Sequence, residues 1–259
     1  MSSVRVSYSG LIALLVAIIG VITGMVFVII VSRNLSPEEL GLWTLINGLV
    51  GYVFLIDPIV SYWNTRQIAR GEQVGKSAMF VAMFFSAGGI VAYLIMSTFV
   101  SNTLTIDYSI LLLAAALIPL SLFRNTLNAI AHGTNPHYDQ FGFVFFELTK
   151  IPLGFLFVVV SDLGLYGAIL AIIFSNVVRV IFLSIALRTH LYGEIKRQVI
   201  TFWFKMSWLP LYGAIPGFII TLDVLIFSMM SNSLIGLAYW TAGITIAAFV
   251  AQSGSFSRA

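Results

Sequence analysis

The chain has 259 residues, of which 59% are hydrophobic and 9% charged, and its net charge is +3. A soluble domain usually carries about 25% charged residues, so this composition excludes an ordinary soluble domain and favours a membrane protein. The chain has no cysteine, which excludes disulfides, thiolate catalysis and cysteine metal sites; we interpret the excess of basic residues as topological, not as a sign of nucleic-acid binding.

Charges and turn residues divide the sequence into eight apolar segments, each long enough to cross a bilayer as a helix. Lipid-exposed backbone must satisfy its own hydrogen bonds, and these segments are too uniformly apolar for the alternating strands of a barrel. We therefore predict an all-α fold, a polytopic membrane helix bundle of about eight transmembrane helices. The predicted helices cover approximately residues 9–32, 39–63, 77–101, 108–131, 138–160, 164–187, 206–230 and 234–252.

The connections between these helices predict how the chain is oriented. With the N-terminus inside the cell, the inside segments hold nine of the 13 Lys and Arg residues, and the outside loops hold only Arg33. Because Lys and Arg are enriched in cytoplasmic loops, we expect a multi-pass protein of the inner cell membrane with both ends in the cytoplasm. The inside residues are Arg5, Arg66, Arg70, Lys76, Arg188, Lys196, Arg197, Lys205 and Arg258.

Residues 188–208 combine basic and aromatic side chains. Lys196 and Lys205 lie close to Phe202 and Trp203, a mixture typical of a helix at the membrane surface. We predict a helix in the cytoplasmic interface that turns into the seventh transmembrane helix. A plain loop with a belt of aromatic residues is the alternative.

The first and seventh predicted helices share a sequence pattern. The GxxxG motif at residues 20–24 recurs at residues 213–217, and Leu40-Gly41-Leu42-Trp43 has a counterpart in Ile235-Gly236-Leu237-Ala238-Tyr239. Two landmarks in the same order indicate a repeat of six helices, so that both copies lie the same way up in the membrane.

This repeat predicts the domain organisation. Residues 1–200 would form an N-terminal six-helix lobe that includes the interfacial segment 188–205. Residues 206–259 would form the first two helices of a second lobe. Two complete copies would need a longer chain, so we expect a truncated chain or a second chain that supplies the rest.

Six charged residues lie within the predicted helices, where each needs a partner, a water-filled cavity or a function. Glu147 and Lys150 face the same way, which suits either a self-neutralised pair or an anion-binding Lys150 with Glu147 as a tuning or cation-binding group. Arg124 and Arg179 either extend to the inner interface or line a basic cavity where they pair with phosphate. The predicted cationic cavity, which would bind the substrate, is thus lined by Arg124, Lys150 and Arg179.

Two acidic residues are further candidates for a coupling cation. Asp57 precedes Pro58, which is expected to free a backbone carbonyl; the carboxylate and this carbonyl could hold Na⁺ or a proton, and an interfacial acid is the alternative. Asp223 lies in the outer part of the seventh helix. We predict no cofactor and no metal, because the three histidines are expected at loop surfaces and the sequence has no motif of a hydrolase or a phosphate-binding loop.

Three short motifs carry a family resemblance: Arg33 to Trp43 (RNLSPEELGLW), Ala69-Arg70-Gly71, and Leu222-Asp223-Val224-Leu225-Ile226 followed by residues 235–239. They resemble polysaccharide-biosynthesis, O-antigen-type oligosaccharide flippases of the multidrug/oligosaccharidyl-lipid/polysaccharide (MOP) exporter superfamily. The resemblance implies a two-lobed bundle with a cationic cavity and alternating access. It also implies that polyprenyl-diphosphate-linked oligosaccharide is moved from the cytoplasmic to the outer leaflet, and it marks Asp223 as a family-like position.

The partners expected from this resemblance are lipid-linked oligosaccharide, membrane lipids and glycan-assembly enzymes, without nucleic acid. A cation-coupled multidrug exporter of the same fold is the main alternative, although the basic residues argue against a pocket for organic cations. A membrane-embedded glycan polymerase or glycosyltransferase fits less well, because the outside loops are short. A non-catalytic membrane scaffold is a further alternative.

Overall fold

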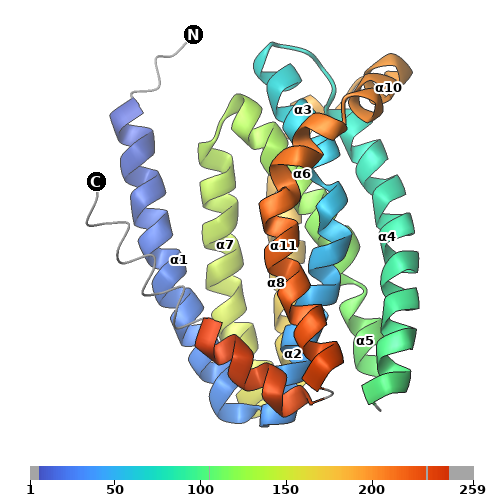
Figure 1. The fold of residues 1–259 in the computed structure, drawn as a ribbon. Coiled ribbons are helices and arrows are strands. Elements are labelled where there is room, and N and C mark those ends of the chain that lie inside the picture. Colours follow the sequence, from blue (N-terminus) through green and yellow to red (C-terminus); the bar gives the residue numbers. More distant parts are fainter. Residues whose placement is uncertain (1–5, 105, 232, 245–259) are drawn as a thin grey trace, which may run out of the picture.

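Long helices run side by side to form a bundle (Figure 1). The computed structural model describes residues 6–104, 106–231 and 233–244, and these contain helices and no β-strand. The start of α1, the loop after α3 and helix α10 lie at one end of the bundle, and the turn between α1 and α2 lies at the other (Figure 1). The helices are α1 (Val6–Asn34), α2 (Pro37–Val53), η1 (Phe54–Ile56), α3 (Pro58–Ala69), α4 (Gly75–Leu104), α5 (Tyr108–Ala114), α6 (Leu117–Thr134), α7 (His137–Gly154), η2 (Phe155–Val160), α8 (Gly164–Ala186), α9 (Arg188–Leu191), α10 (Arg197–Lys205), α11 (Trp208–Ser231) and Leu234–Ile244.

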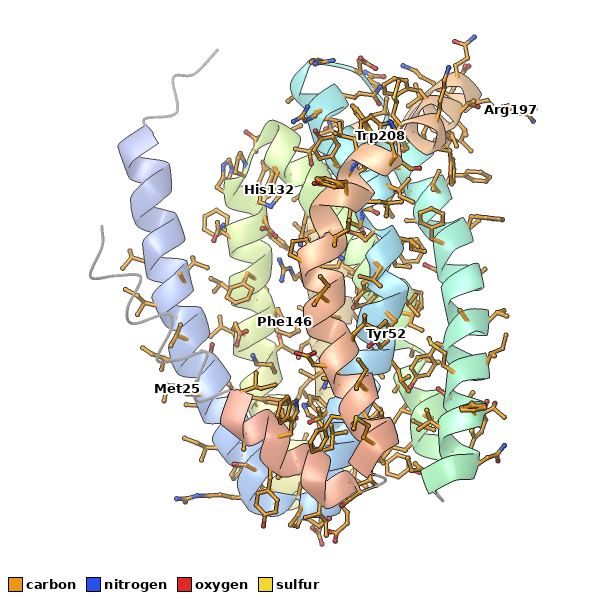
Figure 2. All side chains as sticks on the ribbon, in the orientation of Figure 1. Met25, Tyr52, His132, Phe146, Arg197 and Trp208 are labelled. Carbon is orange, nitrogen blue, oxygen red and sulfur yellow. The ribbon has the colours of Figure 1, made fainter. Side chains whose placement is uncertain are left out.

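Within the described residues, 6 helical segments are long and apolar enough to cross a membrane. Apolar side chains project outward from α1 and α4 (Figure 2), as expected for a surface that faces lipid. The predicted polytopic helical membrane bundle is thereby confirmed. Helix α11 coincides with the seventh predicted helix, and Leu234–Ile244 covers the first part of the eighth, whose residues 245–252 lie outside the described residues. Neither is among the 6 spanning segments, and the division into two lobes stays a prediction.

Three of the predicted membrane helices contain a break close to a proline. The second consists of α2, the 3₁₀ turn η1 and α3, and Pro58 follows that turn. The fourth is divided between α5 and α6 shortly before Pro119, and the fifth ends in the π-helical η2 after Pro152. Proline cannot donate the backbone hydrogen bond that a continuous helix requires, so the ladder is rearranged near each of these sites.

The segment predicted as one interfacial helix is instead two short helices, α9 and α10. Gly193 has a φ of +121°, a conformation that suits glycine and ends α9. Helix α10 is held against the bundle by Trp203, which is fully buried and whose indole N–H donates to the side-chain oxygen of Gln67 at 2.8 Å. Phe202 packs edge-on against Trp63 of α3.

At the opposite end, Glu39 joins the start of α2 to the start of α8. Ser36 and Glu39 form a capping box, in which the Ser36 hydroxyl accepts from the Glu39 N–H and the Glu39 carboxylate accepts from the Ser36 N–H. The second carboxylate oxygen accepts from the N–H of Leu165 at 3.1 Å. One side chain therefore satisfies the ends of two helices that are 126 residues apart along the chain.

The variant Glu39→Ala should lower the thermal unfolding temperature of the purified protein, because a lost helix cap costs about 1 kcal/mol and two helix ends lose an acceptor here. Glu38→Ala is the matched control, since Glu38 is the exposed neighbour in the same helical turn. Equal unfolding temperatures for the two variants would contradict the role assigned to Glu39.

Candidate functional site

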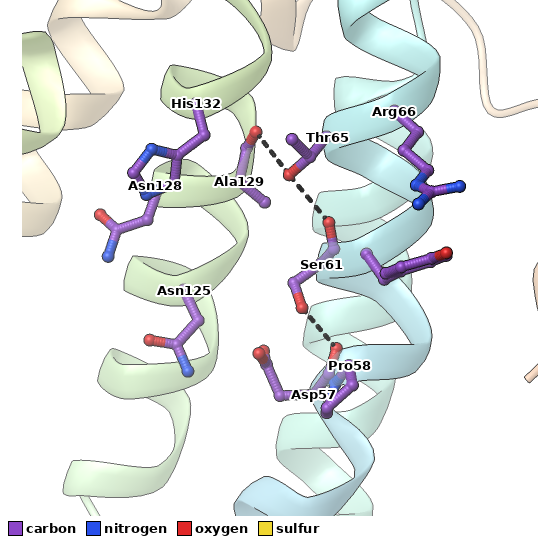
Figure 3. Close-up of a pocket in the computed structure, with 10 residues that line it drawn as sticks. Asp57, Pro58, Ser61, Thr65, Arg66, Asn125, Asn128, Ala129 and His132 are labelled. Atoms are coloured by element: carbon purple, nitrogen blue, oxygen red, sulfur yellow. Dashed lines mark hydrogen bonds between the residues drawn. The ribbon is translucent and has the colours of Figure 1, made fainter. Parts of the chain in front are cut away.

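A polar pocket of about 510 Å³ lies between α3 and α6. Figure 3 shows its two walls, with α3 on one side and α6 on the other. A carboxylate, hydroxyls, amides and an imidazole face this space, although both helices lie within the bundle. The lining residues are Asp57, Pro58, Ser61, Tyr62, Thr65, Arg66, Asn125, Asn128, Ala129 and His132.

Asp57 projects its carboxylate across the pocket toward Asn125 (Figure 3). None of the ion pairs among the described residues includes Asp57. The expected free carbonyl beside it is wrong: the Phe54 carbonyl, which loses its helical donor at Pro58, accepts from the Asp57 N–H at 3.0 Å. The Asp57 carboxylate is therefore not joined by a second, unpaired backbone oxygen freed by the proline.

Arg124, on α6, is held by amide oxygens. Its guanidinium donates to the side-chain oxygen of Asn176 on α8 at 2.8 Å and to that of Asn125 at 3.3 and 3.4 Å. Asn125 thus contacts Arg124 on one side and faces Asp57 on the other. The two opposite charges act on one another electrostatically, but an uncharged amide separates them.

Arg179, on α8, is instead closed into an ion pair. Its guanidinium lies 2.6 Å from the Asp139 carboxylate on α7, and both side chains are largely buried. The amide of Asn128 lies beside this pair, and one orientation of that amide bonds both partners. His132 approaches the other Asp139 oxygen at 3.4 Å. Asp139 therefore links α7 to α8 and to the end of α6.

Lys150 and Glu147 form a second, separate cluster on α7. Their charged atoms are 2.6 Å apart, and the two residues are only 6% and 3% exposed. The Lys150 ammonium also lies over the rings of Phe27 and Phe146, at 5.4 and 5.1 Å. The carboxylate and the aromatic faces therefore both act to offset the charge of the buried ammonium.

The structure thus brings three of the six candidate residues into one network and leaves three outside it. Asn125 lies between Asp57 and Arg124. Asn128, one helical turn further along α6, contacts Arg179 and, in its other amide orientation, the Arg124 backbone carbonyl. Lys150 lies about two helical turns along α7 from Phe143, whose ring contacts Arg179. Asp223 is exposed on α11. The role of each residue stays a prediction.

Sequence patterns did not identify the neutral and acidic partners in this network. Asp139 lies in the first turn of α7, where an acid is usual at a helix start, so its pairing with Arg179 left no separate signal. His132 was expected at a loop surface but is the last basic residue of α6 and contacts Asp139. Asn125, Asn128 and Asn176 lie within membrane helices, and that position was the only available signal.

Metal ions in proteins are held by groups of side chains that lie close together. The described part of the chain contains no group of three or more His, Asp or Glu residues that could hold a metal ion. The oxygen atoms that face the pocket belong mostly to neutral side chains.

The variant Asp139→Asn should lower the thermal unfolding temperature, because removing one partner from a buried ion pair costs on the order of 3–5 kcal/mol. Adding Arg179→Gln should recover part of this loss, since the unpaired charge is then removed. Asp162→Asn, at the opposite end, is the control. If the double variant instead unfolds at a lower temperature than Asp139→Asn, by as much as Arg179→Gln alone lowers that of the wild type, the pairing is contradicted.

Comparison with known proteins identifies the fold. No protein-family model and no curated protein sequence matches the chain, but solved transporter structures do. An inward-facing multidrug resistance MATE family transporter of the MOP superfamily superposes with a TM-score of 0.66 at 15% identity, over 88% of this chain and 57% of that one.

Two further structures agree. A MOP superfamily transporter from Pyrococcus furiosus, described as having a binding pocket of reverse polarity, gives a TM-score of 0.62 at 16% identity over 90% of this chain. A MATE protein in the bent conformation gives 0.60 at 15% identity over 89%. The chain spans 57% of the length of each of these two proteins as well. The chain therefore has the fold of MOP superfamily transporters, over somewhat more than half of their length.

Proposed function

We propose that this chain forms part of a membrane transporter that works by alternating access and moves polyprenyl-diphosphate-linked oligosaccharide from the cytoplasmic to the outer leaflet. The fold supports a transporter of this architecture, and the chemistry of the buried charges supports an anionic substrate. In this proposal the protein lies in the inner cell membrane with its basic end in the cytoplasm, works beside glycan-assembly enzymes, and is not an enzyme itself.

The observation that best supports an anionic substrate is that the Arg124 guanidinium has no carboxylate among its hydrogen-bond partners. Arg179 and Lys150 each have a carboxylate at 2.6 Å, whereas the hydrogen bonds of Arg124 go to the neutral amides of Asn125 and Asn176. A guanidinium held only by neutral acceptors keeps its full charge and can bind phosphate through two parallel hydrogen bonds. We assign the diphosphate contact to Arg124, with Arg179 and Lys150 as positioned but neutralised neighbours.

The proposal predicts a strong effect of Arg124→Gln in the complete protein, measured as export of lipid-linked glycan to the outer leaflet at matched protein level. Loss of a charge-assisted phosphate contact costs about 1.5–3 kcal/mol, so export should fall by roughly tenfold or more, and Arg124→Lys should retain part of it. Arg33→Gln, which changes a basic residue at the opposite end, should have no effect. Full export by Arg124→Gln would contradict the assignment.

A multidrug exporter is the second candidate, and it fits the fold equally well. The surroundings of the Lys150 ammonium favour it, because the Glu147 carboxylate and the rings of Phe27 and Phe146 that hold this cation would also suit an organic cation in its place. The multidrug description of one matching structure points the same way. Drug-susceptibility assays in a sensitive host separate the candidates: resistance lost in Glu147→Gln, with glycan export absent, would establish the multidrug function and exclude the flippase.

For the coupling ion, we propose that Asp57 binds a proton. Its carboxylate faces a polar pocket and has no ion-pair partner. The groups that interact with this carboxylate, the Ser61 hydroxyl and the Asn125 amide, are neutral, so no cation among the described residues is in direct contact to hold it in the charged form. A proton needs only the carboxylate itself, whereas a dehydrated Na⁺ needs several oxygen ligands, and Asp57 is the one carboxylate among the residues that line the pocket. Asp223, the other acidic candidate for a coupling cation, stays a prediction, since the resemblance to flippases marks the position without fixing its role.

Dicyclohexylcarbodiimide, which modifies protonated carboxyl groups in apolar surroundings, tests the protonation of Asp57. Peptide mass spectrometry of the wild-type protein should show preferential labelling of Asp57, declining as the pH rises, since only the protonated form reacts. Asp139 and Glu147, both ion-paired, are controls within the same molecule. Labelling of Asp57 no greater than theirs, or protection of Asp57 by sodium chloride but not by choline chloride, would exclude the proton.

A further inference from the structure

Two segments far apart in the sequence form one strongly basic surface at the end of the bundle that holds α10. Residues 66–76 contain the end of α3 and the following loop, and residues 188–205 contain α9 and α10. Together they hold seven Lys and Arg residues and two Glu residues, and all nine are exposed. We name this surface the basic platform; its basic residues are Arg66, Arg70, Lys76, Arg188, Lys196, Arg197 and Lys205.

The two halves of the basic platform are fixed to one another. The backbone N–H of Lys196 donates to the Ser77 hydroxyl at 2.9 Å. The backbones of Gly75 and His190 approach so closely that a Cβ atom on Gly75 would lie 2.3 Å from the His190 carbonyl oxygen. With Trp203 buried against α3, these contacts hold the positive charges in one arrangement.

Exposed aromatic side chains border the same surface. Tyr192 and Trp208 are 72% and 65% exposed, and Phe204 is 44% exposed. Arg197 and Trp208 lie at the same end of the molecule in Figure 2. Large exposed aromatic residues next to Lys and Arg are typical of the boundary between lipid headgroups and acyl chains.

The opposite end of the bundle has the reverse charge. Its turns and helix starts carry the acids Glu38, Glu39, Asp107 and Asp162 and the single base Arg33. At Asp107, hydrogen bonds from Ser109 hold the pKa of the carboxyl below its usual value. A bilayer with anionic headgroups would therefore be attracted to one end only.

From this charge and aromatic arrangement we propose that the basic platform binds anionic phospholipid headgroups. Helix α10 is joined to α11 by only two residues, Met206 and Ser207. A lipid bound across α10 and the loop after α3 would hold the point at which α11 leaves the platform. This role is independent of the substrate, and it holds for a flippase and for a drug exporter.

The test compares the wild type with the triple variant Lys196→Gln/Arg197→Gln/Lys205→Gln in reconstituted membranes. Spin-labelled phosphatidylglycerol and phosphatidylcholine report relative association with the protein. Each basic residue near an anionic surface is worth about 1 kcal/mol, or roughly fivefold in affinity, so the preference for phosphatidylglycerol should fall by up to about 100-fold. Arg33→Gln, at the other end, should leave the preference unchanged.

An unchanged preference in a folded triple variant would overturn the proposal. If the triple variant fails to fold, the single variant Arg197→Gln and the salt dependence of the wild type take its place. The preference for phosphatidylglycerol should then fall in Arg197→Gln, and in the wild type it should fall as the salt concentration rises. A preference that does not depend on salt would refute the proposal. Displacement of the labelled lipid by soluble pyrophosphate at equal charge would assign a free phosphate ligand instead. Stronger competition by RNA or by an acidic protein would likewise refute a lipid site.

Discussion

A charged side chain inside a bilayer is tolerated only with compensation, and the buried charges of this bundle are compensated unequally. Arg179 with Asp139 and Lys150 with Glu147 are direct ion pairs at 2.6 Å. Arg124 and Asp57 lie on either side of Asn125 and are only partly compensated. Breaking either direct pair would leave an uncompensated buried charge, whereas we propose that the separated charges of Arg124 and Asp57 are the ones that bind ligands.

This arrangement couples the two ligands that we propose. Protonation of Asp57 removes a negative charge that opposes an anion near Arg124, so a bound proton should strengthen the binding of a diphosphate, and a bound diphosphate should strengthen the binding of the proton. The asparagine residues that carry this interaction lie on α6 and α8, and Asp57 lies at the break before α3. The proposed protonation site thus lies among helices that contact one another, α3 with α6 and α6 with α8.

The sequence predicted the type of fold and the positions of the described helices well, because long apolar runs are a strong signal; the orientation expected from the Lys and Arg distribution stays a prediction. The sequence also predicted that ionisable residues lie within the helices and offered a Glu147–Lys150 pair as one alternative, but it did not predict the pairs that form between helices. The pairing of Lys150 with Glu147 was one of two predicted alternatives, whereas the partner of Arg179, Asp139, was not predicted and is 40 residues away along the chain. Pairing across helices depends on packing, and neutral residues such as Asn125 give no pattern in one sequence. The break between α9 and α10 likewise depends on a single glycine at residue 193.

The most direct test of the interrupted pair is the affinity of the complete protein for a polyprenyl-diphosphate lipid, measured by calorimetry as a function of pH in the wild type and in Asp57→Asn. The wild type should bind more tightly as the pH falls, and Asp57→Asn should bind tightly at every pH, because its position 57 carries no charge. An affinity that is independent of pH in the wild type, or weaker in Asp57→Asn at all pH values, would contradict the coupling of Asp57 to Arg124.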